Sequence, residues 1–166
     1  MKYLFSILLC LGNLFIYAQK KNSQFELLIR KTTEPVVIDG VMNDAAWQEA
    51  ETADNFFMVL PMDTSKARVN TQVKMSYDKE NLYIIAICHL PVKRPYMVES
   101  LRRDFNFGKN DNFIFFLDPF NDLTNGYTFG ANAAGAQWDG TLYEGGKADL
   151  NWDNKWVSVA KNYEDK

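Results

Sequence analysis

Four side chains whose oxygen atoms can bind a hard cation lie within eight residues: Asp118, Asn121, Asp122 and Asn125. Calcium takes six to eight such oxygens in flexible geometry, so residues 118–125 are a candidate calcium site. Their spacing differs from the EF-hand pattern. The alternative is a turn-rich loop in which the same side chains cap backbone N–H groups. If calcium is bound, millimolar calcium should raise the melting temperature and EDTA should lower it.

Trp138 lies among small and polar neighbours in the stretch AQWD at residues 136–139. Flat aromatic rings bind the apolar faces of sugars, and amide, carboxylate and arginine groups bind the sugar hydroxyls. Trp138 is therefore a candidate stacking residue, with candidate polar contacts at Asp139, Asn132 and Arg102. The alternative is that the indole is a wedge between two sheets.

The adjacent Arg102, Arg103 and Asp104 favour an internal ion pair, for example with Asp111, over a contact with a ligand. The usual structural role of arginine is a bidentate pair between its guanidinium group and a carboxylate. The other interpretation is that these residues face a carboxylate of a ligand.

Several classes of function have little support in the sequence. His89 is the single histidine, so no histidine pair can hold zinc, and any Ser-His-Asp triad must use it. The 21 acidic residues make carboxylate pairs unavoidable by chance, so a glycosidase pair is not indicated. The net charge is −3 and basic residues form no block, which argues against a nucleic-acid partner. We therefore expect no enzyme activity from this chain.

The elements that must position these residues follow a period of two, which is typical of strands. A hairpin is predicted over residues 69–88, and residues 82–88, apolar on both faces, indicate a central strand covered on both sides. Further strands are predicted at residues 113–117, 127–132, 136–143 and 152–160. Residues 43–50 favour a short helix whose Trp47 covers the end of the fold. The expected fold is all-β, a two-sheet antiparallel, jelly-roll-like β-sandwich with one short helix near its start.

The two ends of the chain predict export and a continuing fold. Residues 1–18 have the positive start, apolar stretch and small Ala18 of a secretory signal peptide. A membrane anchor is the weaker alternative, because the apolar run is short and interrupted. Lipidation at Cys10 is disfavoured because Leu9 precedes it. Residues 19–166 form one domain, and the polar turn at residues 162–166 predicts that the last strands of the sandwich are missing.

Several motifs occur in an order that resembles family 9 carbohydrate-binding modules. PVVIDG at residues 35–40 and DAAW at 44–47 resemble the start of such a module. NLYI at 81–84, DNF at 111–113, GYTF at 126–129 and WD at 152–153 follow in the same order. RRD at 102–104 and DPFND at 118–122 point to a branch found at the N-terminus of large bacterial secreted proteins, where a region resembling an outer-membrane barrel follows.

The resemblance implies a non-catalytic module that binds a poly- or oligosaccharide. It also implies export to the periplasm, the outer membrane or the exterior, as part of a larger glycan-processing or outer-membrane protein. Some modules of this family carry structural calcium, which keeps Ca²⁺ as the one candidate cofactor. The alternative is a docking domain of a barrel protein that does not bind sugar. A third hypothesis is electron transfer, because related sandwiches bind haem through Met and His.

Overall fold

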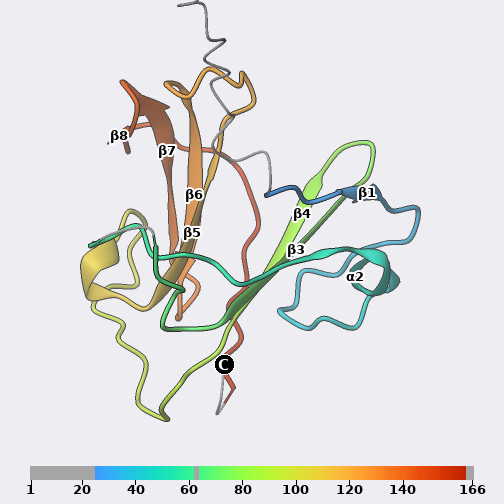
Figure 1. Cartoon of the computed structure of the whole chain (residues 1–166), viewed down its shortest axis with the longest axis horizontal. Helices are drawn as coiled ribbons and strands as arrows, with labels where there is room; N and C mark the ends of the chain where they lie inside the picture. The colour runs from blue at the N-terminus through green and yellow to red at the C-terminus, as the bar shows by residue number, and fades with distance from the viewer. Residues whose placement is uncertain (1–24, 62–63, 164–166) are drawn as a thin grey trace, which may run out of the picture.

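The computed structural model describes residues 25–61 and 64–163. The predicted signal peptide at residues 1–18 and Cys10 lie outside the described residues. Two β-sheets dominate the described part, with one short α-helix and one 3₁₀ helix. Figure 1 shows the sheets as two layers, with the chain after β8 running down between them. The predicted all-β, two-sheet fold is confirmed.

The first sheet is built on the predicted hairpin. Strand β3 (Thr71–Tyr77) pairs with β4 (Leu82–Cys88) in antiparallel register, from Thr71 opposite Cys88 to Tyr77 opposite Leu82. The Asp78 carboxylate closes the turn, because it accepts hydrogen bonds of 2.7 Å from the backbone N–H groups of Glu80 and Asn81. Two short strands, β1 (Arg30–Lys31, parallel) and β2 (Thr52–Ala53, antiparallel), pair with the other edge of β3.

The second sheet has the strand order β5-β6-β7-β8 and is antiparallel throughout. Its strands are β5 (Asn112–Leu117), β6 (Gly126–Asn132), β7 (Gln137–Tyr143) and β8 (Lys147–Asp149). The first three confirm the strands predicted there, and β8 was not predicted. Along β6, buried Thr128 alternates with half-buried Tyr127 and Phe129. The two faces of this sheet are therefore buried to different extents.

The predicted helix is also present, as α2 (Ala45–Glu49). Its Trp47 is buried, and the indole Nε1 donates a 3.1 Å hydrogen bond to Asp44. A 3₁₀ helix, η1 (Phe107–Lys109), begins after Asn106, whose side chain accepts a hydrogen bond from the N–H of Gly108. No helix among the described residues is long and apolar enough to cross a bilayer.

The strand predicted at residues 152–160 is wrong, because this segment has no strand partner. Its side chains still alternate, with Trp156 half-buried and Val157 73 % exposed. The Trp156 carbonyl accepts a 3.0 Å hydrogen bond from the Gln137 side chain, and the Trp156 ring contacts Phe129 at 5.5 Å. The period of two therefore reflects packing over β6 and β7, with side-chain hydrogen bonds in place of a ladder.

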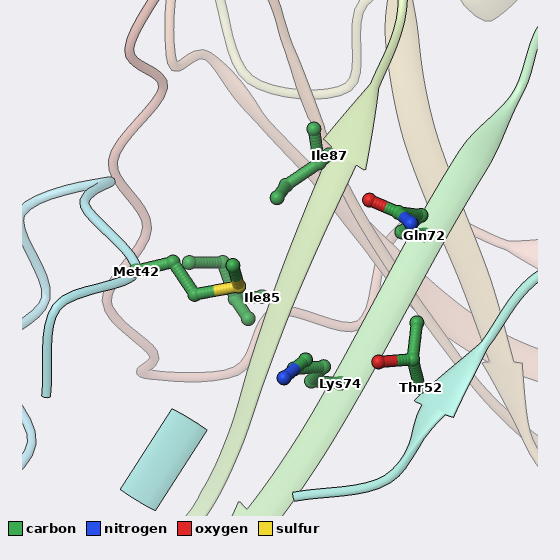
Figure 2. Close-up of a pocket in the computed structure, with 6 residues that line it drawn as sticks. All are labelled: Met42, Thr52, Gln72, Lys74, Ile85 and Ile87. Carbon is green, nitrogen blue, oxygen red and sulfur yellow. The ribbon is translucent and has the colours of Figure 1, made fainter. Parts of the chain in front are cut away.

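The prediction of a central strand at residues 82–88 is also wrong. Within the described ranges, strand β4 pairs only with β3, and most of its residues are half-buried. The apolar residues on both faces of β4 are not explained by a central position in the sheet. In Figure 2 Ile85 and Ile87 project from the face of the hairpin opposite the second sheet, where they border a pocket. An apolar residue on each face therefore does not require a strand neighbour on each edge.

Candidate functional site

A pocket of about 230 Å³ lies on the outer face of the first sheet. Figure 2 shows its lining, with strands of the second sheet behind β3 and β4. Three lining residues are apolar and three carry polar groups: Met42, Ile85 and Ile87, and Thr52, Gln72 and Lys74. A second hollow, of about 360 Å³, is lined by polar and charged residues at the β3–β4 turn and residues 31–33, and it has no apolar wall.

Strand register places the pocket residues on one face. In an antiparallel pair, residues directly opposite each other project to the same side. Gln72 lies opposite Ile87, and Lys74 lies opposite both Ile85 on β4 and Thr52 on β2. Met42, from the segment before α2, reaches over this face from the side (Figure 2). The polar side chains of β2 and β3 therefore face an apolar wall made by β4 and Met42.

Two of the three polar side chains of the pocket, those of Lys74 and Gln72, contact neighbouring groups. Lys74 Nζ donates a 2.6 Å hydrogen bond to the backbone carbonyl of Trp47, which ties the lysine to α2. Gln72 Oε1 lies 3.5 Å from Nε2 of His89, the single histidine. Such an arrangement can bind a small amphipathic ring, with C–H groups on the isoleucines and hydroxyls toward Thr52, Gln72 and Lys74.

The four sequence-predicted ligand residues do not converge on one surface. Trp138 is only 5 % exposed, and the ring of Phe107 packs edge-on against it at 6.1 Å. Asp139 is 0 % exposed and, as the next residue on β7, projects to the opposite face. Asn132 is buried and its amide donates to the carbonyl of Ser100, whereas Arg102 is exposed. The ring of Trp138 is buried against Phe107 of η1, on the face of β7 opposite Asp139, which differs from a wedge between the two sheets.

Arg103, rather than Arg102, forms the internal ion pairs of this region. Its guanidinium pairs with buried Asp139, and its Nε donates a 2.7 Å bond to Asp153. It also donates to the Gln137 side chain at 2.8 Å and to the Asn154 carbonyl at 3.1 Å. The predicted structural use of arginine is thus correct in kind, with different partners.

Two neighbouring carboxyl groups have shifted pKa values. Asp111, the partner expected for Arg103, pairs instead with Arg94, which lowers the pKa of that carboxyl group. Burial raises the pKa of Asp104, whose Oδ1 has no hydrogen-bond partner in the described part of the chain. Asp104 therefore stays outside the ion pairs of its neighbour Arg103.

Residues 118–125 form the turn-rich loop of the second interpretation. Asp118 accepts hydrogen bonds from the N–H groups of Phe120 and Leu123, at 3.1 and 2.9 Å. Asp122 accepts from Thr124 and from both nitrogens of Asn125, each at 2.8 Å, and these bonds hold its pKa far below the ordinary value. The carboxylates face N–H donors rather than one another, and no cluster of three acidic, histidine or cysteine ligands occurs in the described residues. As arranged, the loop does not fit calcium.

The pocket residues were missed by the sequence analysis, although a signal for them exists. Polar Gln72 and Lys74 lie on one face of a predicted strand, and Ile85 and Ile87 lie on a strand with apolar residues on both faces. Once the two strands pair, the register places the isoleucines opposite the polar side chains. An apolar residue on an otherwise polar sheet face is therefore the sequence signal.

Comparison with known proteins gives one family. The family model described as "Carbohydrate family 9 binding domain-like" matches residues 38–164. Comparison with curated proteins and with solved structures gives no match. The match spans most of the described chain, from the segment before α2 to the end of the segment that follows β8.

Proposed function

Because the chain belongs to the carbohydrate family 9 binding domain-like family, we propose that it is a non-catalytic domain that binds poly- or oligosaccharide through the pocket on β2, β3 and β4. Domains of this family are binding modules, which supports a role without catalysis. The observation that favours this pocket is its division into an apolar and a polar wall. A pyranose ring has the same division, into C–H faces and hydroxyl edges.

Calorimetric titration with a panel of neutral and acidic oligosaccharides tests the proposal. Gln72→Met keeps the length of the side chain and removes its hydrogen-bonding groups. We expect it to weaken binding by about 3- to 10-fold, the effect of one hydrogen bond. The matched control is Gln48→Met, the same change at an exposed position on α2. Titrations without heat for every sugar, or equal effects of both variants, would contradict binding at this pocket.

We also propose that the domain is exported and acts at the bacterial surface, in the periplasm, at the outer membrane or outside the cell. The predicted signal peptide at residues 1–18 supports this location. In this setting the module holds glycan near a larger glycan-processing or outer-membrane protein. N-terminal sequencing of the secreted product tests the proposal, with Gln19 as the expected first residue. A product that retains Met1 and stays in the cytoplasm would contradict it.

A second candidate function is docking to a membrane-barrel region of the same parent protein without sugar binding. The observation that favours it is that the long strands β4 and β5 each pair on one side only among the described residues. Exposed edges bind added strands through backbone hydrogen bonds. Flat sugar titrations together with co-purification of the barrel region would favour this function over the first.

A further inference from the structure

Among the described residues that line the pocket, Lys74 is the only charged one. Its side chain is half-buried, and its single hydrogen bond goes to a neutral acceptor, the carbonyl of Trp47. An ammonium group has three donors, so two remain for other partners. No carboxylate in the described residues lies within ion-pair distance of Lys74. The pocket therefore contains a positive charge that is held by α2 and has no counter-ion in the described part of the chain.

Two acidic residues that lie close in sequence to the pocket segments have other partners. Asp44, between Met42 and α2, accepts the indole hydrogen bond of Trp47. Glu51, next to Thr52, accepts a 3.1 Å hydrogen bond from the N–H of Leu28. The charge of Lys74 is fixed by α2 and has no acidic partner among the described residues. A ligand that brings an anionic group therefore gains more there than in water.

We infer that the pocket selects an acidic sugar, a pyranose that carries a carboxylate or sulfate group paired with Lys74. This inference rests on the proposed function, because it names the class of sugar for the same pocket. Ile85, Ile87 and Met42 contact the C–H face of the ring. Thr52 and Gln72 bind its hydroxyls, and the lysine fixes the orientation through the anionic group.

Ligand-observed NMR titration of the full chain tests this with D-glucuronate, D-glucose 6-sulfate and D-glucose. We expect both acidic sugars to bind at least about tenfold more tightly than glucose at low salt, the gain from one charge-assisted hydrogen bond. Their advantage should shrink as salt is added, because ions screen a partly exposed pair. A preference for one acidic sugar identifies carboxylate or sulfate as the group that is recognised.

Variants of Lys74 distinguish the effect of losing its charge from the effect of disturbing the fold. Lys74→Met should remove the preference for acidic sugars, because it weakens their binding much more than the binding of glucose. Lys74→Arg keeps the charge and should retain the preference even if removal of the lysine loosens α2. Lys79→Met is the matched control, because Lys79 is exposed in the β3–β4 turn outside this pocket. Melting curves of each variant show whether the fold is intact.

The outcomes distinguish the inference from the proposed function. Equal binding of glucose and the acidic sugars, unaffected by Lys74→Met, would overturn the inference and leave carbohydrate binding in place. Binding of acetate or sulfate ions as tightly as the acidic sugars would also overturn it, since the ring would then contribute nothing. The absence of any binding across neutral and acidic oligosaccharides would overturn the proposed function itself.

Discussion

Arg103 connects three segments of the chain through one guanidinium group. It contacts Asp139 on β7, Asp153 in the segment after β8, and the side chain of Gln137. Asp139 also accepts a 2.8 Å hydrogen bond from the N–H of Asn154. A segment without a strand ladder is thereby fixed to the second sheet. At this scale stability depends on whether each carboxylate is buried or exposed.

Removal of the buried carboxylate should cost much more than removal of the exposed one. Asp139 is 0 % exposed, so Asp139→Ala leaves the guanidinium without its buried partner, and we expect a loss of about 3 kcal/mol in unfolding free energy. The Asp153 side chain is 65 % exposed, so Asp153→Ala should cost less than about 1 kcal/mol. Urea denaturation measures both. Equal losses would show that the ion pair does not anchor this segment.

Trp138 illustrates what single residues reveal in sequence. Its polar neighbours in the chain suggested an exposed ring, yet the side chain that covers it is Phe107, 31 positions earlier. Local sequence contains no information on such a contact, because the contact is made by the fold of the loop around η1. By contrast, Trp47 is correctly predicted as core, since the helix that buries it is local.

The burial of Trp138 gives a second prediction. Trp138→Ala should destabilise the chain by about 3–5 kcal/mol, the range for truncation of a buried aromatic residue. Phe107→Ala should cost less, because Phe107 is 60 % exposed. Thermal or urea unfolding measures both changes. A Trp138→Ala chain of undiminished stability that loses sugar binding would restore the stacking interpretation.

At the scale of elements, the β3–β4 turn should make stability depend on pH. Hydrogen bonds from the N–H of Glu80, the hydroxyl of Tyr83 and the N–H of Asn81 lower the pKa of Asp78 from 3.8 to about 2. Because the folded pKa is depressed, the carboxylate stabilises the fold above pH 4, and this contribution is lost as the pH falls toward 2.

Melting temperatures between pH 6 and pH 2 test this prediction. The unmodified chain should lose stability more steeply than Asp78→Asn below pH 4, because the amide does not titrate. Glu80→Gln is the control in the same turn, and it should keep the steep fall because the Glu80 side chain accepts none of these bonds. Parallel curves for the unmodified chain and Asp78→Asn would show that Asp78 does not cause the loss of stability at low pH.

The stability of the loop at residues 118–125 should depend on its internal hydrogen bonds and not on a bound metal. We expect millimolar calcium and EDTA to leave the melting temperature unchanged, since the carboxylates of Asp118 and Asp122 accept N–H groups. Asp118→Ala should lower the melting temperature without any calcium, because it leaves turn N–H groups without a partner. A rise with calcium that Asp118→Ala abolishes would instead establish the calcium site.

Strands were predictable from the sequence where they are six or seven residues long and pair with a neighbour in the chain. The hairpin of β3 and β4 and the meander of β5, β6 and β7 have short connections, so period and turn residues suffice. Strands β1 and β2 have two residues each, too few to show any period. The segment after β8 shows the period without the ladder, since alternation reports burial and not backbone pairing.

For the whole molecule, the main consequence of the topology is that two of the sheet edges, those of β4 and β5, are long and apolar. In the described part of the chain, β4 and β5 each pair on one side only, and neither strand contains a charged residue. Long apolar edges promote association between chains, and natural proteins usually protect them with charge, proline or a covering segment. Of the two, the free edge of β5 is the one at which we expect chains to associate, because Phe116 on this strand is 63 % exposed.

A charge on β5 should therefore reduce self-association. We expect Phe116→Lys to lower the average particle size at high protein concentration, since a lysine on an edge strand disfavours pairing with a second chain. Phe120→Lys is the matched control, because Phe120 is also 63 % exposed but lies in the loop after β5. Light scattering over a concentration series measures the effect. If both variants reduce association equally, general surface hydrophobicity and not the open edge is responsible, because only Phe116 lies on the strand.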